Sequence, residues 1–291
     1  MTPMVTIASA LLEATHRLAA GGIENPRGEA RLLLSHALGF GPEKIIGHSE
    51  LAIDDDGLTN FEAALSRRVR REPMSHVLGK REFWSLDFRV TPDTLDPRPD
   101  SETLVDAVLE HTVGGKRSLR VLDLGTGTGC LLLAILSELP NAAGVGVDIS
   151  PAALAVAREN SAMLGLDKRA DFKIGDWDAG LDGDFDIIIS NPPYIPTADL
   201  DRLEPEVGRF EPRLALDGGI DGLSEYRTLA PVIKRRLCCR GTAFIELGEG
   251  QFESVAEIMT GMELEISDRR HDLGGVPRCM VVQRATALTN R

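Results

Sequence analysis

The sequence predicts an α/β protein in which a doubly wound, mainly parallel sheet follows a small helical domain. From residue 119 onwards, short apolar runs alternate with stretches of helical length, which is the pattern of repeated βαβ units. Residues 1–75 show helical periodicity instead, and residues 76–96 alternate like a hairpin. We therefore predict an N-terminal helical domain over 1–75, a β-hairpin linker over 76–96 and the sheet domain over 97–291.

The composition is that of a globular protein. Hydrophobic residues make up 43% of the chain and charged residues 26%, and no run reaches the roughly 20 apolar residues that cross a bilayer. The four cysteines form no Cys-x-x-Cys pair and have no histidine at ligand spacing, so no metal site is expected. The N-terminus lacks the features of a signal peptide. We expect a cytoplasmic monomer without a membrane partner.

The net charge is −13, and most of the excess acidic residues follow residue 95. Proteins that grip long duplex DNA present a positive surface, so direct DNA binding is not expected. An exception is the arginine cluster Arg67, Arg68, Arg70 and Arg71. It forms either a solvated helix face or a contact for an acidic partner or RNA.

Three helices are predicted in the N-terminal domain, over residues 5–20, 27–38 and 59–71. Asn25 and Pro26 are a start signal for the second helix. The apolar positions expected on the helix faces are Ile7, Leu11, Leu12 and Leu18, then Ala30, Leu32, Leu33, Leu34 and Leu38, then Phe61, Leu65 and Val69.

The sheet domain is predicted to alternate strands and helices and to end in an antiparallel pair. The predicted strands are 119–124, 143–147, 171–174, 185–190, 242–247, 264–269 and 278–283, and the predicted helices are 101–111, 130–139, 151–164, 222–238 and 250–260. Ser150 and Pro151 form a cap signal for the third of these helices.

The chain is organised around Asn191-Pro192-Pro193-Tyr194, which follows a short isoleucine-rich strand. Each proline fixes φ and removes an N–H donor, so the corner presents an amide side chain and free carbonyls at the carboxyl end of a strand. Ligands bind at that edge of open α/β sheets, and such oxygens suit an –NH2 group. Asn-Pro-Pro is also a common sequence where a strand simply ends and a loop begins.

A glycine loop follows the first strand of the sheet, with the sequence Gly125-Thr126-Gly127-Thr128-Gly129. Glycines there permit positive φ and a close approach of backbone to ligand. The spacing is neither that of a dinucleotide fingerprint nor that of a P-loop. This tighter loop therefore suits a ligand without phosphates.

Two further strand ends carry groups that suit a nucleoside. Asp148 ends the second strand, where a carboxylate accepts both hydroxyls of a ribose. Asp176 and Trp177 follow the third strand, where an adenine would find an acceptor and an aromatic face. Because these groups lie at successive strand ends, we expect them at one edge of one sheet.

These motifs together resemble the class I S-adenosylmethionine-dependent methyltransferases, with a mainly parallel seven-stranded sheet. Asn191-Pro192-Pro193-Tyr194 is similar to the [DNS]PP[YFW] motif of enzymes that methylate planar –NH2 nitrogens. The stretches 81–84, 97–102, 210–219 and 272–278 resemble the HemK/PrmC family, which methylates the glutamine of the Gly-Gly-Gln motif in class-one peptide-chain release factors. Ser101 departs from the usual threonine, and Asp96 from the usual apolar residue.

The resemblance implies that S-adenosylmethionine binds through the glycine loop (Gly125, Thr126, Gly127, Thr128, Gly129), Asp148, Trp177 and Asn191. Asn191 Oδ1 and the Pro192 carbonyl are expected to accept the two hydrogens of the substrate amide, with Pro193 stiffening the corner and Tyr194 packing over the amide plane. The roles of Arg98, Glu102 and Glu246 stay open. Alternative substrates are a ribosomal-protein glutamine or an amino group of a nucleic acid.

Overall fold

The computed structural model describes residues 4–113 and 118–285, and the chain divides into two compact units. The first unit is Met1–Lys80 with Glu204–Phe210, and the second is Arg81–Leu203 with Glu211–Arg291. The boundaries proposed from the sequence near residues 75 and 96 stay predictions. No helix of the described residues combines the length and the apolar character needed to cross a membrane.

The first unit is built from helices around its own apolar core. Its helices are α1 (Ile7–Ala20), α2 (Pro26–Leu38), α3 (Pro42–Gly47), α4 (Asp55–Val69), α5 (Met74–Leu78) and α9 (Pro205–Phe210). Asn25 caps α2, because its side chain accepts a hydrogen bond from Gly28 N at 3.2 Å. The three predicted helices are confirmed as α1, α2 and α4.

Some details of the predicted first unit are wrong. Leu12 and Leu32 are exposed, because the buried stripe of α1 runs through the small residues Ala10 and Ala14 and that of α2 through Leu33 and Leu34. The alternation that predicted a strand at 76–79 is instead the helix α5, whose burial shows no strand period.

The arginine cluster is largely engaged within the first unit. Arg67 pairs with Glu72 at 2.5 Å, and the buried Arg68 pairs with Glu29 and Glu206 at 2.5 and 2.8 Å. Arg71 also pairs with Glu206, at 2.6 Å, and with Glu204 at 3.0 Å. A solvated face does not describe these three side chains. Arg68 joins α4 to α2 and α9, Arg71 also bonds α9, and Arg67 bonds Glu72 and carbonyls of α5.

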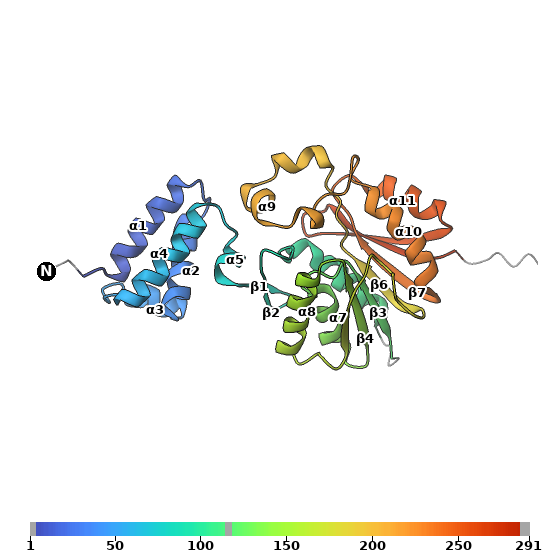
Figure 1. Ribbon diagram of the computed structural model, residues 1–291, viewed down its shortest axis with the longest axis horizontal. Helices are drawn as coiled ribbons and strands as arrows, with labels where there is room; N and C mark the ends of the chain where they lie inside the picture. Colours follow the sequence, from blue (N-terminus) through green and yellow to red (C-terminus); the bar gives the residue numbers. More distant parts are fainter. Residues whose placement is uncertain (1–3, 114–117, 286–291) are drawn as a thin grey trace, which may run out of the picture. The chain divides into compact units, whose positions relative to one another are not determined.

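The second unit is an α/β sandwich on a seven-stranded sheet (Figure 1). The order of strands is β5-β4-β3-β6-β7-β9-β8, with β3 to β7 parallel and β9 antiparallel to both neighbours. The strands are β3 (Arg120–Leu124), β4 (Ala143–Asp148), β5 (Ala170–Ile174), β6 (Phe185–Ser190), β7 (Leu237–Glu246), β8 (Leu264–His271) and β9 (Pro277–Arg284). The predicted doubly wound sheet with a closing antiparallel pair is confirmed.

Helices cover both faces of this sheet. They are α6 (Glu102–Thr112), α7 (Cys130–Glu138), α8 (Pro151–Met163), α10 (Ser224–Arg236) and α11 (Phe252–Gly261), with the short turns η1 (Pro99–Ser101), η2 (Thr197–Arg202) and η3 (Arg213–Ala215). A hairpin of β1 (Lys80–Phe83) and β2 (Leu86–Arg89) turns through Trp84 and Ser85, both at positive φ. The prediction from the sequence placed the start of β7 five residues too late and did not include the short turns η1, η2 and η3.

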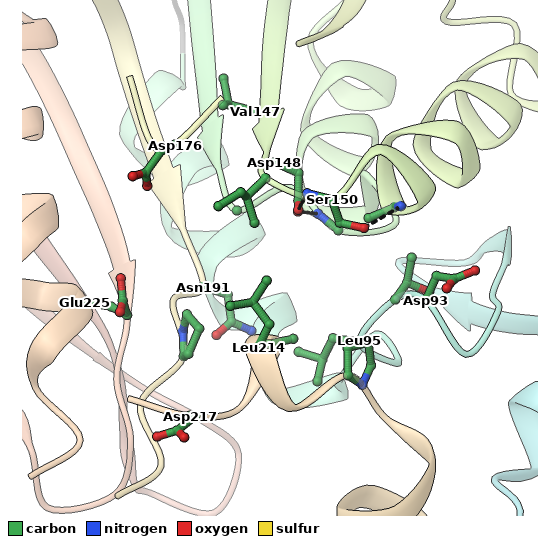
Figure 2. Close-up of a pocket in the computed structure, with 18 of the residues that line it drawn as sticks. Asp93, Leu95, Val147, Asp148, Ser150, Asp176, Asn191, Leu214, Asp217 and Glu225 are labelled. Carbon is green, nitrogen blue, oxygen red and sulfur yellow. Dashed lines mark hydrogen bonds between the residues drawn. The ribbon is translucent and has the colours of Figure 1, made fainter. Parts of the chain in front are cut away.

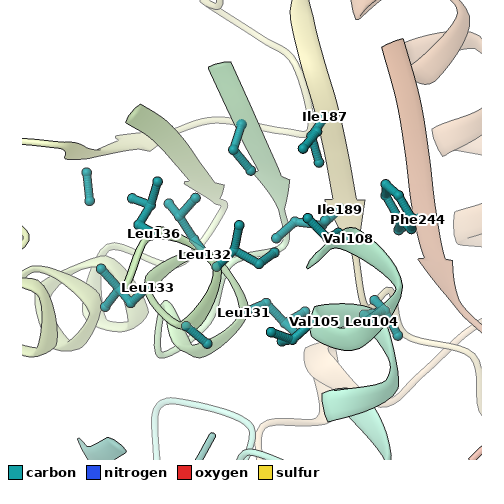
Figure 3. Packing of buried hydrophobic residues seen from close by; sticks show 14 of the residues in the cluster. Leu104, Val105, Val108, Leu131, Leu132, Leu133, Leu136, Ile187, Ile189 and Phe244 are labelled. Atoms are coloured by element: carbon teal, nitrogen blue, oxygen red, sulfur yellow. The ribbon is translucent and has the colours of Figure 1, made fainter. Parts of the chain in front are cut away.

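The central strand β6 shows how the two faces are built. Ile187 and Ile189 point to the cluster that contains Leu104 of α6 and Leu132 of α7 (Figure 3). Ile188 points to the opposite cluster, which is filled by α10 and α11. Because successive side chains of a strand alternate between faces, a run of three isoleucines is buried on both sides. This burial fixes the place where β6 ends and the Asn191 corner begins.

Candidate active site

The glycine loop between β3 and α7 is tied to the end of β4. The N–H groups of Gly125 and Thr126 both donate to the Val147 carbonyl at 2.9 Å. Gly127 N donates to Asp148 Oδ2 at 2.9 Å. Gly125 and Gly127 have φ of 75° and 54°, a conformation that glycine adopts without strain. The loop therefore presents bare backbone beside the Asp148 carboxylate.

Asp148 is held from both sides. While Oδ2 accepts from Gly127, Oδ1 accepts from Ser150 N at 2.9 Å, at the start of α8. Each carboxylate oxygen has two lone-pair positions, so the fixed carboxylate retains capacity for two hydroxyl donors. Ser150 also caps α8, as predicted, by accepting from Ala153 N.

The corner after β6 is anchored at several points. Ser190 Oγ donates to the Leu124 carbonyl at 2.8 Å, next to the glycine loop. Asn191 Nδ2 donates to Ser101 Oγ at 3.2 Å, and Ser101 Oγ donates to Glu246 Oε2 at 2.5 Å. The Tyr194 carbonyl accepts from Gln251 Nε2 at 3.0 Å.

The glycine loop, Asp148 and Asn191 line one cavity of about 400 Å³ (Figure 2), a size typical of cofactor sites. Six of the predicted residues line it: Gly125, Gly127, Asp148, Trp177, Asn191 and Pro193. Asp176 lines it as well. The ring of Trp177 stands over Gly125, where an added Cβ would lie 3.7 Å from the indole.

The other predicted residues lie outside the lining of this cavity. Thr126 is buried and donates from Oγ1 to Asp123 at 2.5 Å, while Thr128 Oγ1 accepts from Cys130 N. Gly129 packs against α7, α8 and β5. Pro192 is buried, and Tyr194 packs on the core cluster beneath α10 and α11. That the Tyr194 ring covers the substrate amide stays a prediction.

Sequence reasoning missed part of the cavity wall. Leu95 and Asp93, in the segment after the hairpin, line this cavity, and so does Leu214 (Figure 2). Glu225, at the start of α10, lies on the same side of the cavity as Asp176 (Figure 2). Burial raises the pKa of Glu225, and the charge of Asp176 raises it further. The motif over 210–219 was a signal for Leu214, whereas no pattern marked Glu225.

The residues whose roles were open now have definite contacts. Arg98 Nη2 donates to both carboxylate oxygens of Glu211 at 2.7 and 2.8 Å, and Glu102 Oε1 accepts from Trp84 N at 2.8 Å. Both interactions are structural within the second unit. Glu246 is buried at the end of β7 and contacts Ser101, directly behind Asn191.

Comparison with known proteins places the chain. Residues 9–79 match the PrmC N-terminal domain and residues 116–213 match a methyltransferase domain. Release factor glutamine methyltransferases from Rhodospirillum rubrum and Caulobacter vibrioides are 47% and 43% identical to it, covering 93% and 91% of this chain and 83% and 95% of those proteins. The chain belongs to the release factor glutamine methyltransferase family.

A solved structure supports the fold of this family member. The catalytic domain of hMettl16, in a complex with the MAT2A 3'UTR hairpin 6, is 15% identical and covers 78% of this chain and 84% of that one, with a TM-score of 0.56. The release factor glutamine methyltransferase fold is thus that of the class I methyltransferases, whose methyl donor is S-adenosylmethionine.

The cavity of this methyltransferase fits that donor. Gly127 has no atom within 4 Å of the position of an added Cβ, so the loop leaves room for a ligand against its backbone. Asp148 offers carboxylate oxygens for ribose hydroxyls, and Trp177 offers an aromatic face for adenine. Among residues 4–113 and 118–285, no cluster of three or more His, Cys, Asp or Glu could hold a metal ion.

Proposed function

We propose that this protein transfers a methyl group from S-adenosylmethionine to the side-chain amide nitrogen of the glutamine in the Gly-Gly-Gln motif of class-one peptide-chain release factors. The observation that carries the proposal is the place of Asn191: it lines the cavity with Gly127 and Asp148, and its Nδ2 is bonded to Ser101. The amide oxygen is thereby left to accept from a substrate –NH2 group. The relatives named above cover more than nine-tenths of the chain, which supports the substrate.

When bound, S-adenosylmethionine supplies an electrophilic methyl group on a sulfonium. The chain supplies position and electrostatics. Holding two reactants in line is worth about 7–11 kcal/mol of the barrier. Asn191 Oδ1 and the Pro192 carbonyl accept the two hydrogens of the glutamine amide, which turns its nitrogen lone pair towards the methyl group.

These two acceptors bind the transition state more strongly than the ground state. The substrate nitrogen gains positive charge as its new bond to carbon forms, so its hydrogens become better donors. Pro193, at the cavity wall, keeps the corner stiff. A charged general base is not required, because the methylated nitrogen releases its proton readily.

The partners and setting follow from this substrate. We propose that the protein acts as a monomer in the cytoplasm, where release factors work, and that it does not bind DNA directly. The net charge of −13 supports the last point, since duplex DNA would be repelled.

A methyl-transfer assay with radiolabelled S-adenosylmethionine tests the substrate. Purified release factor, ribosomal protein and duplex DNA are offered side by side. Label is expected on the release factor and is lost when the glutamine of its Gly-Gly-Gln motif is replaced by alanine. Label on ribosomal protein alone, or on DNA alone, would replace the proposal with one of those alternatives.

The Asn191→Ala variant tests the mechanism. Loss of a group that stabilises charge in the transition state lowers kcat about 100-fold or more, whereas the affinity for S-adenosylmethionine, measured by calorimetry, drops modestly. Asn141→Ala is the matched control, because Asn141 is exposed in the turn between α7 and β4, at the other edge of the sheet. Full activity of Asn191→Ala would rule the scheme out.

A further inference from the structure

A buried polar pair lies directly behind Asn191. Ser101 ends η1 and is 2% exposed, and Glu246 ends β7 and is 1% exposed. A buried carboxyl is costly unless it is hydrogen-bonded. Here the contact is Ser101 Oγ at 2.5 Å, and the same Oγ accepts from Asn191 Nδ2 at 3.2 Å. The three side chains form one continuous hydrogen-bonded series.

The direction of this series is set by the chemistry of the hydroxyl. A serine hydroxyl has one hydrogen to donate and two lone pairs to accept. An ionised carboxylate only accepts, so Ser101 gives its hydrogen to Glu246. The hydroxyl then has only lone pairs for Asn191, and these match Nδ2 but not Oδ1.

We propose that Ser101 and Glu246 are positioning residues that hold the Asn191 amide with Oδ1, rather than Nδ2, directed at the substrate amide. The inference rests on the proposed function, because it concerns the acceptor that receives the substrate –NH2 group. A flipped amide would set an –NH2 donor against the donor of the substrate. Hydrogen bonds in series also polarise one another, so a carboxylate at the far end makes Oδ1 a stronger acceptor.

We call the hydrogen-bonded series of Asn191, Ser101 and Glu246 the relay, and the charge of Glu246 controls its direction. Burial raises its pKa to about 7, and the hydrogen bond from Ser101 opposes that rise. The charged groups that act on it are Arg278 of β9, and Arg98 and Asp100 before α6. The other titratable groups around it are Cys130, Tyr194, Tyr226 and Cys279. When Glu246 is protonated it donates to Ser101, whose hydrogen is then free to face Asn191, and the amide orientation is no longer fixed.

Three variants separate this role from a packing role. Ser101→Ala removes the relay, Ser101→Thr keeps the hydroxyl, and Glu246→Gln keeps the volume without the charge. We expect Ser101→Ala and Glu246→Gln to lower kcat about 10- to 100-fold, as for a lost hydrogen bond to a charged group. KM for the release factor and the Kd of S-adenosylmethionine stay close to those of the wild type. Ser101→Thr recovers most of kcat.

Ser161→Ala is the matched control, because Ser161 is an equally buried serine of α8 whose Oγ has no hydrogen-bond partner within the described residues. Its kcat should equal that of the wild type. The wild-type kcat is expected to fall below pH 7, as Glu246 gains a proton, and this limb is absent in Glu246→Gln. A packing role would change Tm in Ser101→Ala but leave the pH profile as it is.

A measurement without turnover tests the relay independently of the substrate. In protein with ¹⁵N-labelled asparagine, the Nδ2 signals of Asn191, assigned by their loss in Asn191→Ala, should titrate with a midpoint near pH 7 in the wild type and not in Glu246→Gln. Nδ2 signals that do not titrate in the wild type overturn the relay. Titrating signals in a protein that labels no release factor would overturn the proposed function and leave the relay standing.

Discussion

Gly127 and Gly129 lie two residues apart in the same loop, at φ of 54° and 79°. An added Cβ at Gly127 meets nothing within 4 Å and enters the cavity wall. At Gly129 it meets Leu133, Ala157 and Phe172 at 3.2, 3.3 and 3.4 Å. The first glycine therefore serves ligand access and the second serves packing, although the sequence motif treats them alike.

Alanine substitutions distinguish the two roles. Gly127→Ala should lower the free energy of unfolding by about 1 kcal/mol, for left-handed backbone in a non-glycine residue. It should weaken S-adenosylmethionine binding more than it weakens the fold. Gly129→Ala adds crowding and should cost about 3 kcal/mol of stability. Calorimetry for binding and urea unfolding for stability check both, and equal losses of stability would contradict the distinction.

Some residues of the site could be predicted from the sequence and others could not. Asp148 and Asn191 were predicted because each follows a strand of a sheet whose carboxyl edge binds ligands. Ser101 and Glu246 were not assigned, because their role depends on a contact between residues 145 positions apart. Nothing local marks such a pair, and a serine in a cap position has an ordinary explanation of its own.

At the scale of elements, the segment from Arg98 to Glu102 is bonded to several separate parts of the second unit, including Asn191 of the cavity wall. Arg98 bonds Glu211, Ser101 bonds Glu246 and Asn191, and Glu102 bonds the backbone of Trp84. Asp100 pairs with Arg278 of β9 at 3.3 Å. The segment therefore joins separate parts of the second unit to one another, and we call it the internal clamp.

The pair of Arg98 and Glu211 tests the clamp. The Glu211 side chain is only 1% exposed, so removing its partner leaves an uncompensated carboxylate. Arg98→Met should lower the free energy of unfolding by about 3 kcal/mol. The double variant Arg98→Met, Glu211→Gln should recover much of the loss, because no charge is left unpaired. A double-mutant cycle by urea unfolding gives the coupling, and purely additive losses would contradict the clamp.

The strands and long helices of the second unit were predictable because burial on both sheet faces produces apolar runs of fixed length. The prediction failed for short elements whose conformation depends on tertiary contacts. Residues 76–78 alternate like a strand, yet they form α5, with Ser75, His76 and Val77 all buried. α9 carries no buried side chain of its own, and its Glu206 is fixed by Arg68 of α4 and by Arg71 just after α4, which lie far away in the sequence.

At the scale of the whole molecule, two completely buried carboxyls affect how the stability of the second unit depends on pH. Burial raises the pKa of Asp123 to about 7, against the hydrogen bond from Thr126, and burial also raises that of Glu246 to about 7. In the unfolded chain both groups ionise near pH 4. The folded unit binds more protons than the unfolded chain between these values, so its free energy of unfolding falls as pH rises from about 4 to about 7.

Other carboxylates act in the opposite direction. Hydrogen bonding to Arg235 lowers the pKa of Asp178, and the Val276 N–H lowers that of Asp272. Their stabilisation is present above their unfolded pKa near 4 and is lost as pH falls through their lower folded pKa. The two groups of carboxylates therefore act in opposite directions: the raised pKa values lower the free energy of unfolding as pH rises from about 4 to about 7, and the lowered pKa values lower it as pH falls below about 4.

The Asp123→Asn variant isolates one of these contributions. Between pH 4.5 and 7.5 its free energy of unfolding should fall by about 3 kcal/mol less than that of the wild type, which is the linkage expected for one buried carboxyl. Urea unfolding followed by tryptophan fluorescence reports on this unit, because Trp84 and Trp177 both lie in it. Asp167→Asn, at an exposed position after α8, should keep the wild-type slope. Parallel curves for Asp123→Asn and the wild type would mean that Asp123 is ionised in the folded unit, and its hydrogen bond from Thr126 would then outweigh its burial.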